Sequence, residues 1–481
     1  MKKIICLTMM VTVLMAGLVF AGTVDLPRTG QMKCYDSAGI EIPCTGTGQD
    51  GDIQAGVAWP DPRFTSNADT TIIDNLTGLV WGPDGNIMPT RDPGWDTDGA
   101  VNDGAVTWQH ALDYVAKLNA ENYLNYNDWR LPNVNELESL VNANETNSAT
   151  WLVTQGFTNV QAYDYWSSTS SASSSGSVWV VFMWYGGVGP DYKSGNYDYY
   201  VWPVRGGEDS SYPALGWKTG QTVSYITGDD GDFEMGVAWP LPRFVDHGNG
   251  TVTDKLTGLM WIKDANLPNG ATTWQGALDY VAGMNAGLLP NFGYTDWRLP
   301  NRKELHSLTD FSQYNPALPI GNPFANVQAY YYWSSTTYAY SPDFVWIVSM
   351  YLGSVVGDYK YDGIFVWPVR GPEPTLITLS SFTATPSDRK IILSWTTASE
   401  IDNAGFNLYR AEAEDGEYVK INDSLIPAEG SPTSGATYQY IDSYVKNRIT
   451  YYYKLEDIDL SGTSTMHGPV SATPHRVRSA E

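Results

Sequence analysis

A long internal repeat constrains the fold of this chain more than any other feature. Residues 56–206 recur, with substitutions, at 236–371. Five signatures keep their order: GVAWPDPRF with GVAWPLPRF, LTGLVW with LTGLMW, DWRLPN, NVQAYDYWSST with NVQAYYYWSST, and VWPVRG. Because 481 residues exceed what one hydrophobic core usually holds, we expect two modules of the same fold and a further domain.

The most divergent stretch of the repeat differs on alternate residues. Trp179, Val181 and Met183 are retained as Trp346, Val348 and Met350, whereas Val180, Phe182 and Trp184 correspond to Ile347, Ser349 and Tyr351. A period of two is typical of a β-strand with one face fixed by packing. We therefore predict that Val180, Phe182 and Trp184 face outwards.

The composition of the rest predicts the domain order. We expect a signal peptide at 1–21, modules at 22–210 and 211–372, a β-sandwich at 373–475 and a tail at 476–481. Within each module, Thr107 and Thr273 precede helical apolar spacing. Asn133 with Glu136, and Asn301 with Glu304, have the spacing of capping boxes. The modules are thus expected to be α+β and the last domain all-β.

The first residues predict export. Lys2 and Lys3 precede an apolar run from Ile4 to Phe20, and Val19-Phe20-Ala21 suits cleavage after Ala21. An uncleaved anchor helix is the alternative. We expect a secreted, periplasmic or cell-surface protein whose mature chain does not insert into a membrane. In that setting Cys34 and Cys44 are expected to form a local disulfide, with two free thiols as the alternative.

Charge and composition exclude one class of partner. The formal net charge is −25 and only 17% of residues are charged, so the chain should repel nucleic acid. None of the five histidines is shared by both copies, which argues against a common histidine base.

The shared aspartates have three interpretations. Asp50 and Asp52, with their counterparts Asp230 and Asp232, lie beside glycines and suit tight turns. The same four carboxylates could instead hold Ca²⁺, or do acid–base work. We favour turns, and we expect no other cofactor.

Tyr, Trp, Ser, Gly and Asn dominate the divergent hairpins, as they do in antibody paratopes. Exposed aromatic clusters usually mark binding surfaces. The predicted ligand-binding residues are Phe182, Trp184, Tyr185, Asp191 and Tyr192 in the first module, and Tyr338, Tyr340, Tyr351, Asp358 and Tyr359 in the second.

The signatures carry a family resemblance. TDKLTGLMW, TWQGALDYV, DWRLPNRKEL, YYWSST and VWPVRG resemble the DUF1566 family, also called the Lcl C-terminal domain. RLPNVNEL and VRGG are similar to elements of formylglycine-generating-enzyme-type domains, which implies a C-type-lectin-like fold for each module. The last hundred residues resemble a fibronectin type III domain. The chain departs from these relatives in being acidic, unlike binders of sulfated glycosaminoglycans, and in lacking active-site cysteines.

Together these features predict an exported, non-enzymatic recognition or adhesion protein at the cell surface, with a glycan or a surface protein as ligand. A secreted enzyme that acts on polysaccharide through the shared aspartates is one alternative. A purely structural envelope protein is the other.

Overall fold

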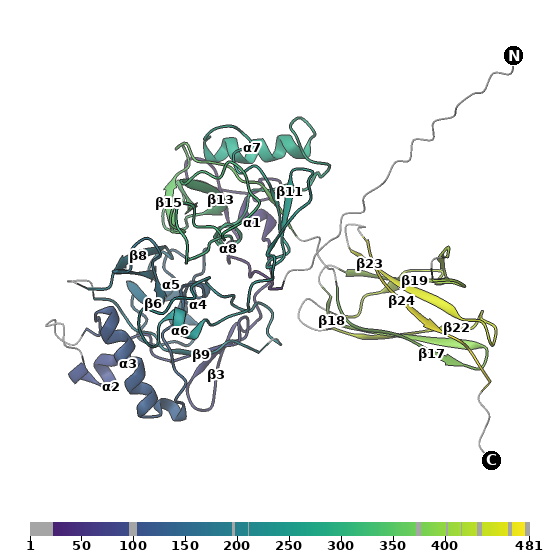
Figure 1. Cartoon of the computed structure of the whole chain (residues 1–481), viewed down its shortest axis with the longest axis horizontal. Helices are drawn as coiled ribbons and strands as arrows, with labels where there is room; N and C mark the ends of the chain where they lie inside the picture. The colour runs from purple at the N-terminus through teal and green to yellow at the C-terminus, as the bar shows by residue number, and fades with distance from the viewer. Residues whose placement is uncertain are drawn as a thin grey trace.

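The computed structural model describes two adjoining β-rich modules and a separate C-terminal sandwich (Figure 1). The described residues are 23–95, 103–194, 198–209, 211–371, 377–400, 403–414, 416–430, 435–459 and 464–476. The predicted signal peptide and most of the predicted tail lie outside these ranges. Within them, no helix has both the length and the apolar character needed to cross a membrane.

Both modules are built from the same parts: a four-stranded antiparallel meander, a long helix, a short helix and a three-stranded hairpin sheet. In the first module these are β3 (Phe64–Ser66), β4 (Ile72–Asp74), β5 (Leu79–Trp81) and β9 (Val204–Gly206), then α3 (Trp108–Ala120), α4 (Val134–Ser139), and β6 (Asp164–Ser170), β7 (Ser177–Phe182) and β8 (Val188–Tyr192). In the second they are β10 (Phe244–Asp246), β11 (Thr251–Asp254), β12 (Met260–Ile262) and β16 (Val369–Arg370), then α7 (Trp274–Asn285), α8 (Arg302–Ser307), and β13 (Tyr331–Thr337), β14 (Phe344–Ser349) and β15 (Val355–Tyr359). Shorter elements are β1 (Cys34–Tyr35), β2 (Glu41–Ile42), α1 (Asp50–Ile53), α2 (Met88–Arg91), α5 (Ser148–Thr154) and α6 (Asp230–Phe233).

The short helices begin where the sequence predicts. Asn133 with Glu136, and Asn301 with Glu304, form capping boxes at the starts of α4 and α8. Thr273 caps α7 by accepting a hydrogen bond from the Gly276 N–H, whereas Thr107 precedes α3 without a side-chain cap. The helix α3 is therefore held by burial of its apolar face rather than by its cap.

The two hairpin sheets join into one. Strands β8 and β15 pair antiparallel at Val188 and Val355, which gives a six-stranded sheet in the order β13-β14-β15-β8-β7-β6. The sheet therefore crosses the boundary between the modules, and its two halves are related by an approximate twofold axis between β8 and β15.

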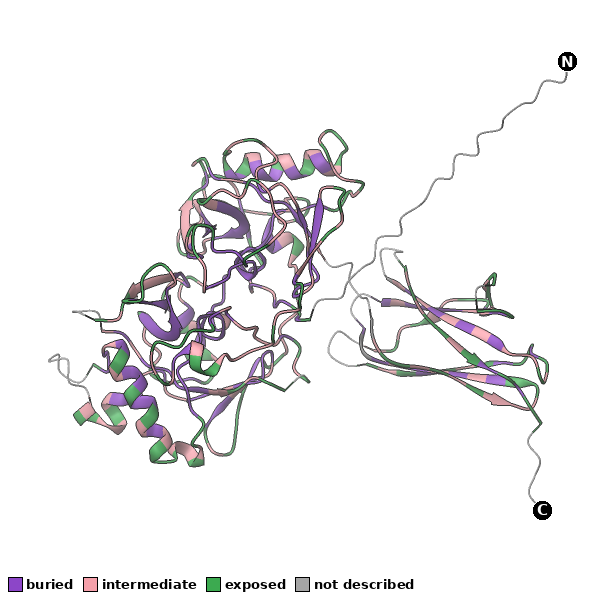
Figure 2. Ribbon diagram, in the orientation of Figure 1, coloured by how far each residue is buried: buried purple, intermediate pink, exposed green. Residues whose placement is uncertain are grey.

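The prediction that Val180, Phe182 and Trp184 face outwards is wrong in part. Trp179 and Val181 lie in the larger core, and Val180 lies in a second core beneath helix α3. Val180 is fully buried, Phe182 is half-buried, and only Trp184 is exposed. The alternation separates two cores, because the helix α3 covers the second face of the sheet. In Figure 2 the neighbouring strand β6 is drawn in the colour of buried residues.

The N-terminal segment of each repeat packs on the other module. Asp50 accepts hydrogen bonds from Thr29 of its own segment and from Thr336 of the second module, at 2.6 and 2.7 Å. Asp230 likewise accepts from Thr219 and from Thr169 of the first module. We call residues 23–57 and 214–237 the exchanged segments.

Because of the exchanged segments, the folded modules do not coincide with the repeats in the sequence. The boundary predicted at 210/211 separates the repeats in sequence, whereas each folded module is completed by the other repeat's segment. The disulfide joins Cys34 to Cys44 within the first exchanged segment, so it braces a segment that packs on the second module.

Helices α4 and α8 meet at the pseudo-twofold axis. Glu138 and His306 occupy the same position after DWRLPN, and they bond to each other at 2.7 Å. Arg302 completes the pairing with Glu138 at 2.9 Å. In a symmetric dimer a residue on the axis would face its own copy; here a carboxylate faces a histidine, which makes the two modules complementary rather than identical.

The C-terminal domain is a two-layered β-sandwich. Its strands are β17 (Ile377–Ser387), β18 (Lys390–Glu400) and β22 (Thr437–Asp442) in one sheet, and β19 (Asn403–Ala411), β20 (Val419–Lys420), β21 (Ile426–Pro427), β23 (Tyr451–Asp459) and β24 (Ser464–Ala472) in the other. Trp395 is fully buried at its centre, and its ring stacks on that of Tyr438. The Tyr451 hydroxyl accepts a hydrogen bond from the Lys446 N–H, as expected of a tyrosine corner.

Candidate ligand-binding surface

Eight aromatic side chains form a continuous run of ring contacts from the first module to the second. We call this set the aromatic stripe; it consists of Phe182, Trp184, Tyr185, Tyr338, Tyr340, Phe344, Tyr359 and Tyr361. The stripe includes six of the ten predicted ligand-binding residues, and adds Phe344 and Tyr361.

Two ring contacts carry the stripe across the module boundary. The rings of Trp184 and Tyr340 meet edge to face with centroids 5.4 Å apart, and those of Tyr185 and Tyr338 do so at 6.0 Å. Edge-to-face pairs at such separations are favourable because the positive edge of one ring meets the negative face of the other. Each module supplies one ring to each pair, so the stripe exists only when the modules are joined.

The first-module part of the stripe sits on a tightly held turn between β7 and β8. The carbonyl of Trp184 accepts a hydrogen bond from the Ser148 N–H at the start of α5. Gly186 has φ +90°, and a Cβ there would lie 2.5 Å from the Val141 side chain. Its carbonyl accepts from Arg302 of the second module at 2.6 Å. A glycine and a partner arginine thus fix the direction of Trp184 and Tyr185.

The second-module part stands on a core residue. The Arg302 guanidinium lies 4.1 Å from the centre of the Trp346 ring, and Trp346 contacts Tyr338 at 4.8 Å. Tyr338 touches Phe344, which meets Tyr359 at 3.9 Å, and Tyr359 stacks on Tyr361. Arg302 therefore supports the stripe in both modules.

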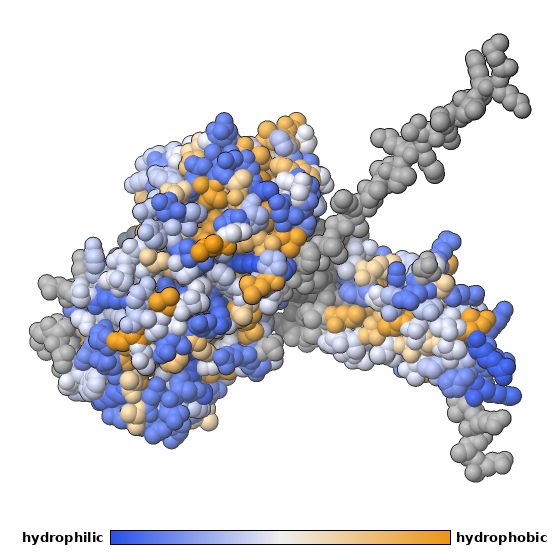
Figure 3. Space-filling view, viewed as in Figure 1, coloured by the Kyte–Doolittle hydropathy of each residue, from blue (hydrophilic) through white to orange (hydrophobic). Residues whose placement is uncertain are grey.

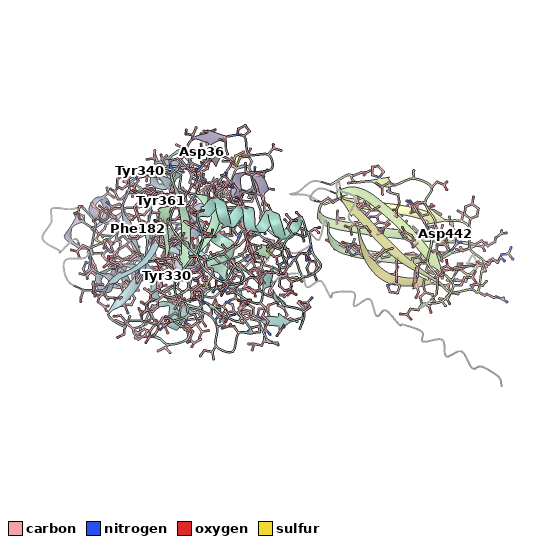
Figure 4. All side chains as sticks on the ribbon, turned by 90° about the horizontal axis from the view of Figure 1, so that it is seen from above. Asp36, Phe182, Tyr330, Tyr340, Tyr361 and Asp442 are labelled. Atoms are coloured by element: carbon pink, nitrogen blue, oxygen red, sulfur yellow. A yellow bond between two sulfur atoms is a disulfide. The ribbon has the colours of Figure 1, made fainter. Side chains whose placement is uncertain are left out.

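The stripe is open to solvent along its length. Trp184 is 42% exposed, Tyr340 52% and Tyr361 67%, while the other five members range from 37% exposed to half-buried. Figure 4 labels Phe182, Tyr340 and Tyr361 in the same part of the paired modules. On the face drawn in Figure 3, residues of high hydropathy form scattered patches.

One carboxylate lies beside the first-module end of the stripe, and a second, Asp191, lies farther along the sheet, opposite Val178. Asp164 is the cross-strand neighbour of Phe182, and its Oδ1 atom is buried without a hydrogen-bond partner among the described residues. Asp191 accepts a 2.5 Å hydrogen bond from the Tyr199 hydroxyl. Burial, with a further contribution from Asp191, raises the pKa of Asp164 to about 7. At this end Asp164 can therefore donate a hydrogen bond when its carboxyl group is protonated and accept one when it is ionised.

Asp164 is a residue that the sequence analysis missed. It stands where the second copy has Tyr331, and it is the single difference within NVQAYDYWSST and NVQAYYYWSST. That lone substitution in an otherwise retained signature was the available signal.

The remaining predicted residues are not members of the stripe, although Asp358 directly precedes the stripe residue Tyr359. Tyr351 occupies the position of Trp184 in the second copy and is 43% exposed, yet it makes no ring contact within the described part of the chain. Asp191 and Asp358 follow the β8–β15 contact in opposite directions, three residues beyond it on each strand. At about 3.3 Å per residue they lie roughly 20 Å apart, so they do not form one catalytic pair. Tyr192 is exposed on the edge of β8.

The four aspartates considered for Ca²⁺ serve the fold. Asp50 and Asp230 are buried acceptors in the module contacts, and Asp52 and Asp232 accept from the N–H groups of Gly48 and Gly228. In the described ranges no group of three or more acidic, histidine or cysteine side chains is arranged to hold a metal ion. These positions are turn and interface residues.

The arginines of the signatures are likewise committed to carboxylates. Arg130 pairs with Glu136 and Arg298 with Glu304, each through both guanidinium ends. Arg205 and Arg370 pair with Asp128 and Asp296. These pairs hold the loops of the four-stranded sheet and the short helix together, so the signature arginines are not free to bind an anionic ligand.

Comparison with known proteins identifies the repeats. A family model described as the Lcl C-terminal domain matches residues 70–205 and 250–370, which is more than half of the chain. Both matches begin after the exchanged segments, so the segments lie outside the family unit.

Other relatives are distant. The amylopullulanase of Thermoanaerobacter thermohydrosulfuricus is 24% identical over 173 residues, which cover 28% of this chain and 11% of that protein's length. A solved Fn3-like protein from Clostridium thermocellum matches 21% of this chain and 93% of its own, at 15% identity and a TM-score of 0.15. A β-1,2-glucanase from Parabacteroides distasonis matches 27% of this chain and 18% of its own, at 17% identity and a TM-score of 0.16.

Proposed function

The chain belongs to the Lcl C-terminal domain family, and we propose that its two modules together form one non-enzymatic binding site for a neutral glycan chain. The observation that carries the proposal is the aromatic stripe, whose exposed rings continue across the module boundary. Rings exposed in a row can stack on the apolar faces of successive sugars. Aromatic side chains also supply much of the contact area in other recognition surfaces.

The polar groups beside the stripe suit sugar hydroxyls. Tyr185, Tyr340 and Tyr361 carry hydroxyl groups, and Asp164 lies at the first-module end. Such groups fix the orientation of a ligand held mainly by apolar contact. The net charge of −25 disfavours sulfated or uronic-acid chains.

Several parts of the proposal extend the family relationship. We propose that each module has a C-type-lectin-like arrangement, that the chain is exported, and that the C-terminal sandwich is a fibronectin type III-type spacer. The protein would then present the stripe to glycans at a cell surface and act in adhesion.

A glycan array, followed by titration calorimetry with the best neutral oligosaccharide, tests the proposal. Trp184→Ala should weaken binding about tenfold or more, since central aromatic contacts of this kind often contribute 1.4 kcal/mol or more. Tyr351→Ala is the matched control, because Tyr351 is the equivalent residue with nearly the same exposed fraction, 43% against 42%. That variant should bind as the wild type does.

Three results would reject the proposal. One is binding that survives Trp184→Ala, and another is the absence of any neutral glycan that binds. The third is release of reducing sugar from a bound glycan that stops in Asp164→Asn, because it would identify an enzyme acting beside the stripe.

A further inference from the structure

A hollow lies where the two modules and the exchanged segments meet, away from the aromatic stripe. Its cavity volume is about 30 Å³, and it is partly open to solvent. Its walls come from the first meander, from α4, from residues 214–217, from Pro27 and from Lys303 of α8. A ligand in this hollow would touch both modules and both exchanged segments.

Lys303 is the unusual residue in the wall. It is 6% exposed, its Nζ atom has no hydrogen-bond partner among the described residues, and its one recorded contact there is with the ring of Trp59, whose centre is 6.0 Å from Nζ. The equivalent residue of the first module is Asn135, which also lines the hollow and donates to the carbonyl of Trp217. An ammonium group has three donors, and leaving them unpaired inside a protein is costly.

The neighbouring carboxylates are already paired. Asp74 receives two hydrogen bonds from Arg63, at 3.2 and 2.9 Å. Glu138 receives one from Arg302 and one from His306. The remaining acid in the wall, Glu136, is held by Arg130 through both oxygens.

Positive charge therefore remains uncompensated at this point. Lys303, Arg63 and Arg302 interact electrostatically with each other and with two carboxylates, Glu138 and Asp74. One Nη1 atom of Arg63 and one of Arg302 also lack partners among the described residues. Burial, reinforced by Arg63, lowers the pKa of Lys303 to about 7, which is the response expected of a cation without a counter-ion.

We propose that the hollow binds a small monovalent anion, of the size of chloride or acetate, through the Lys303 ammonium. The anion supplies the charge that the nearby carboxylates do not, and small movements of the Lys303 side chain bring Nζ to it. Because the walls come from both modules and both exchanged segments, the bound anion stabilises their association.

The experiment compares thermal unfolding of the full chain in chloride, acetate and gluconate at constant ionic strength. Gluconate serves as the large anion that the hollow excludes. The wild type should show a saturable rise in the melting temperature of the paired modules, of about 2 °C or more, in chloride or acetate relative to gluconate. The anion that gives the rise identifies the preferred ligand.

Lys303→Met should abolish the rise, because it keeps the length of the side chain and removes the charge. Lys263→Met is the control, since Lys263 is a partly exposed lysine of the same module that pairs with Asp246; it should keep the rise. Equal melting temperatures in all three salts, or a rise that persists in Lys303→Met, would overturn the proposal.

A second measurement does not depend on the variant folding. Crystals of the wild type soaked in sodium bromide should give an anomalous peak in the hollow within about 3.5 Å of Lys303 Nζ. If the hollow shows only water in such crystals, the proposal is wrong. Neither experiment involves the aromatic stripe, so its failure would leave the proposed glycan site standing.

Discussion

The two ends of the six-stranded sheet share one backbone but carry different side chains. At one end the turn after β7 presents Phe182 and Trp184 to the β13–β14 hairpin; at the other, the equivalent turn after β14 presents Ser349 and Tyr351. Both turns are closed by the same hydrogen bond, from Gly186 to Phe182 and from Gly353 to Ser349, each 2.7 Å long.

The facing hairpins differ in the same sense. Tyr338, Tyr340 and Phe344 of the second module correspond to Ser171, Ser173 and Ser177 of the first. Arg302, which supports the aromatic end, corresponds to Val134. Aromatic residues thus replace serines on both sides of one junction, while the other junction keeps small polar residues. A duplicated, twofold arrangement can therefore carry a single binding site at only one of its two equivalent ends.

Removing the Glu138 carboxylate, which lies on the axis between the two ends of the sheet, should have the largest effect on stability. Glu138→Ala leaves Arg302 and His306 buried without their carboxylate, and loss of one member of a buried ion pair typically costs about 3–5 kcal/mol. Chemical denaturation of the paired modules should measure this loss of unfolding free energy. Both ends of the sheet should unfold in the same transition. Asp279→Ala, at an exposed position on α7, should change the free energy of unfolding by less than about 0.5 kcal/mol. Equal stability of Glu138→Ala and the wild type would show that the contacts of Glu138 on the axis do not stabilise the paired modules.

Replacing Trp184 and Tyr340 together should separate the two ends most clearly. The double variant removes both exposed rings of the central contact, so we expect glycan affinity to fall at least about 30-fold. The same assay on Tyr351→Ala should give less than about a twofold change. If the two variants lose affinity equally, the two ends are functionally alike and the comparison is wrong.

The two exchanged segments should respond to pH in the same direction, unlike the two ends of the sheet. Burial raises the pKa of Asp50 to about 6 and that of Asp230 to about 7. A carboxyl group with a raised pKa in the folded state stabilises the fold below its unfolded pKa, and this contribution is lost as pH rises. The free energy of unfolding should therefore fall between about pH 4 and pH 7.

Asp50→Asn with Asp230→Asn isolates that contribution. The double variant should show a smaller decrease over this pH range than the wild type, as measured by urea denaturation at each pH. Glu138, whose pKa is lowered to about 2 although burial opposes the shift, contributes in the opposite sense below about pH 4. A steeper decrease in the double variant would contradict the assignment of these carboxyl groups.

A small gain should follow from making the serine end resemble the aromatic end. Ser173 is exposed and corresponds to Tyr340, so Ser173→Tyr places a ring opposite Tyr351. We expect a second, weaker glycan site, seen in calorimetry as a stoichiometry above one. Ser174→Tyr, at the next exposed position, should leave the stoichiometry unchanged, and a gain there would show that any added tyrosine suffices.

Much of the scaffold follows from the repeat. The two modules of one fold and the capping boxes at Asn133 and Asn301 were predicted from residue patterns. The strand 177–182 was predicted as well, but its surroundings were not, since a period of two separates two faces without saying whether the second meets solvent or a helix.

The exchange of segments and the aromatic stripe could not be predicted from the sequence, for a different reason. The two exchanged segments are similar enough that TGQDGD and TGDDGD fit either module, so only the folded chain decides which pairing occurs. Trp184 and Tyr340 were each predicted to bind ligand, but as members of separate surfaces. Their contact depends on the β8–β15 pairing, which joins residues far apart in sequence and has no local signal.

The central claim is that one site is formed jointly by both modules. A double-mutant cycle on glycan affinity tests it directly, with Trp184→Ala and Tyr340→Ala singly and combined. Because these rings lie 5.4 Å apart in different modules, their effects should be non-additive by at least about 0.5 kcal/mol, whereas Trp184→Ala and Tyr351→Ala should add. Additive effects of Trp184→Ala and Tyr340→Ala would show two independent sites and contradict the account.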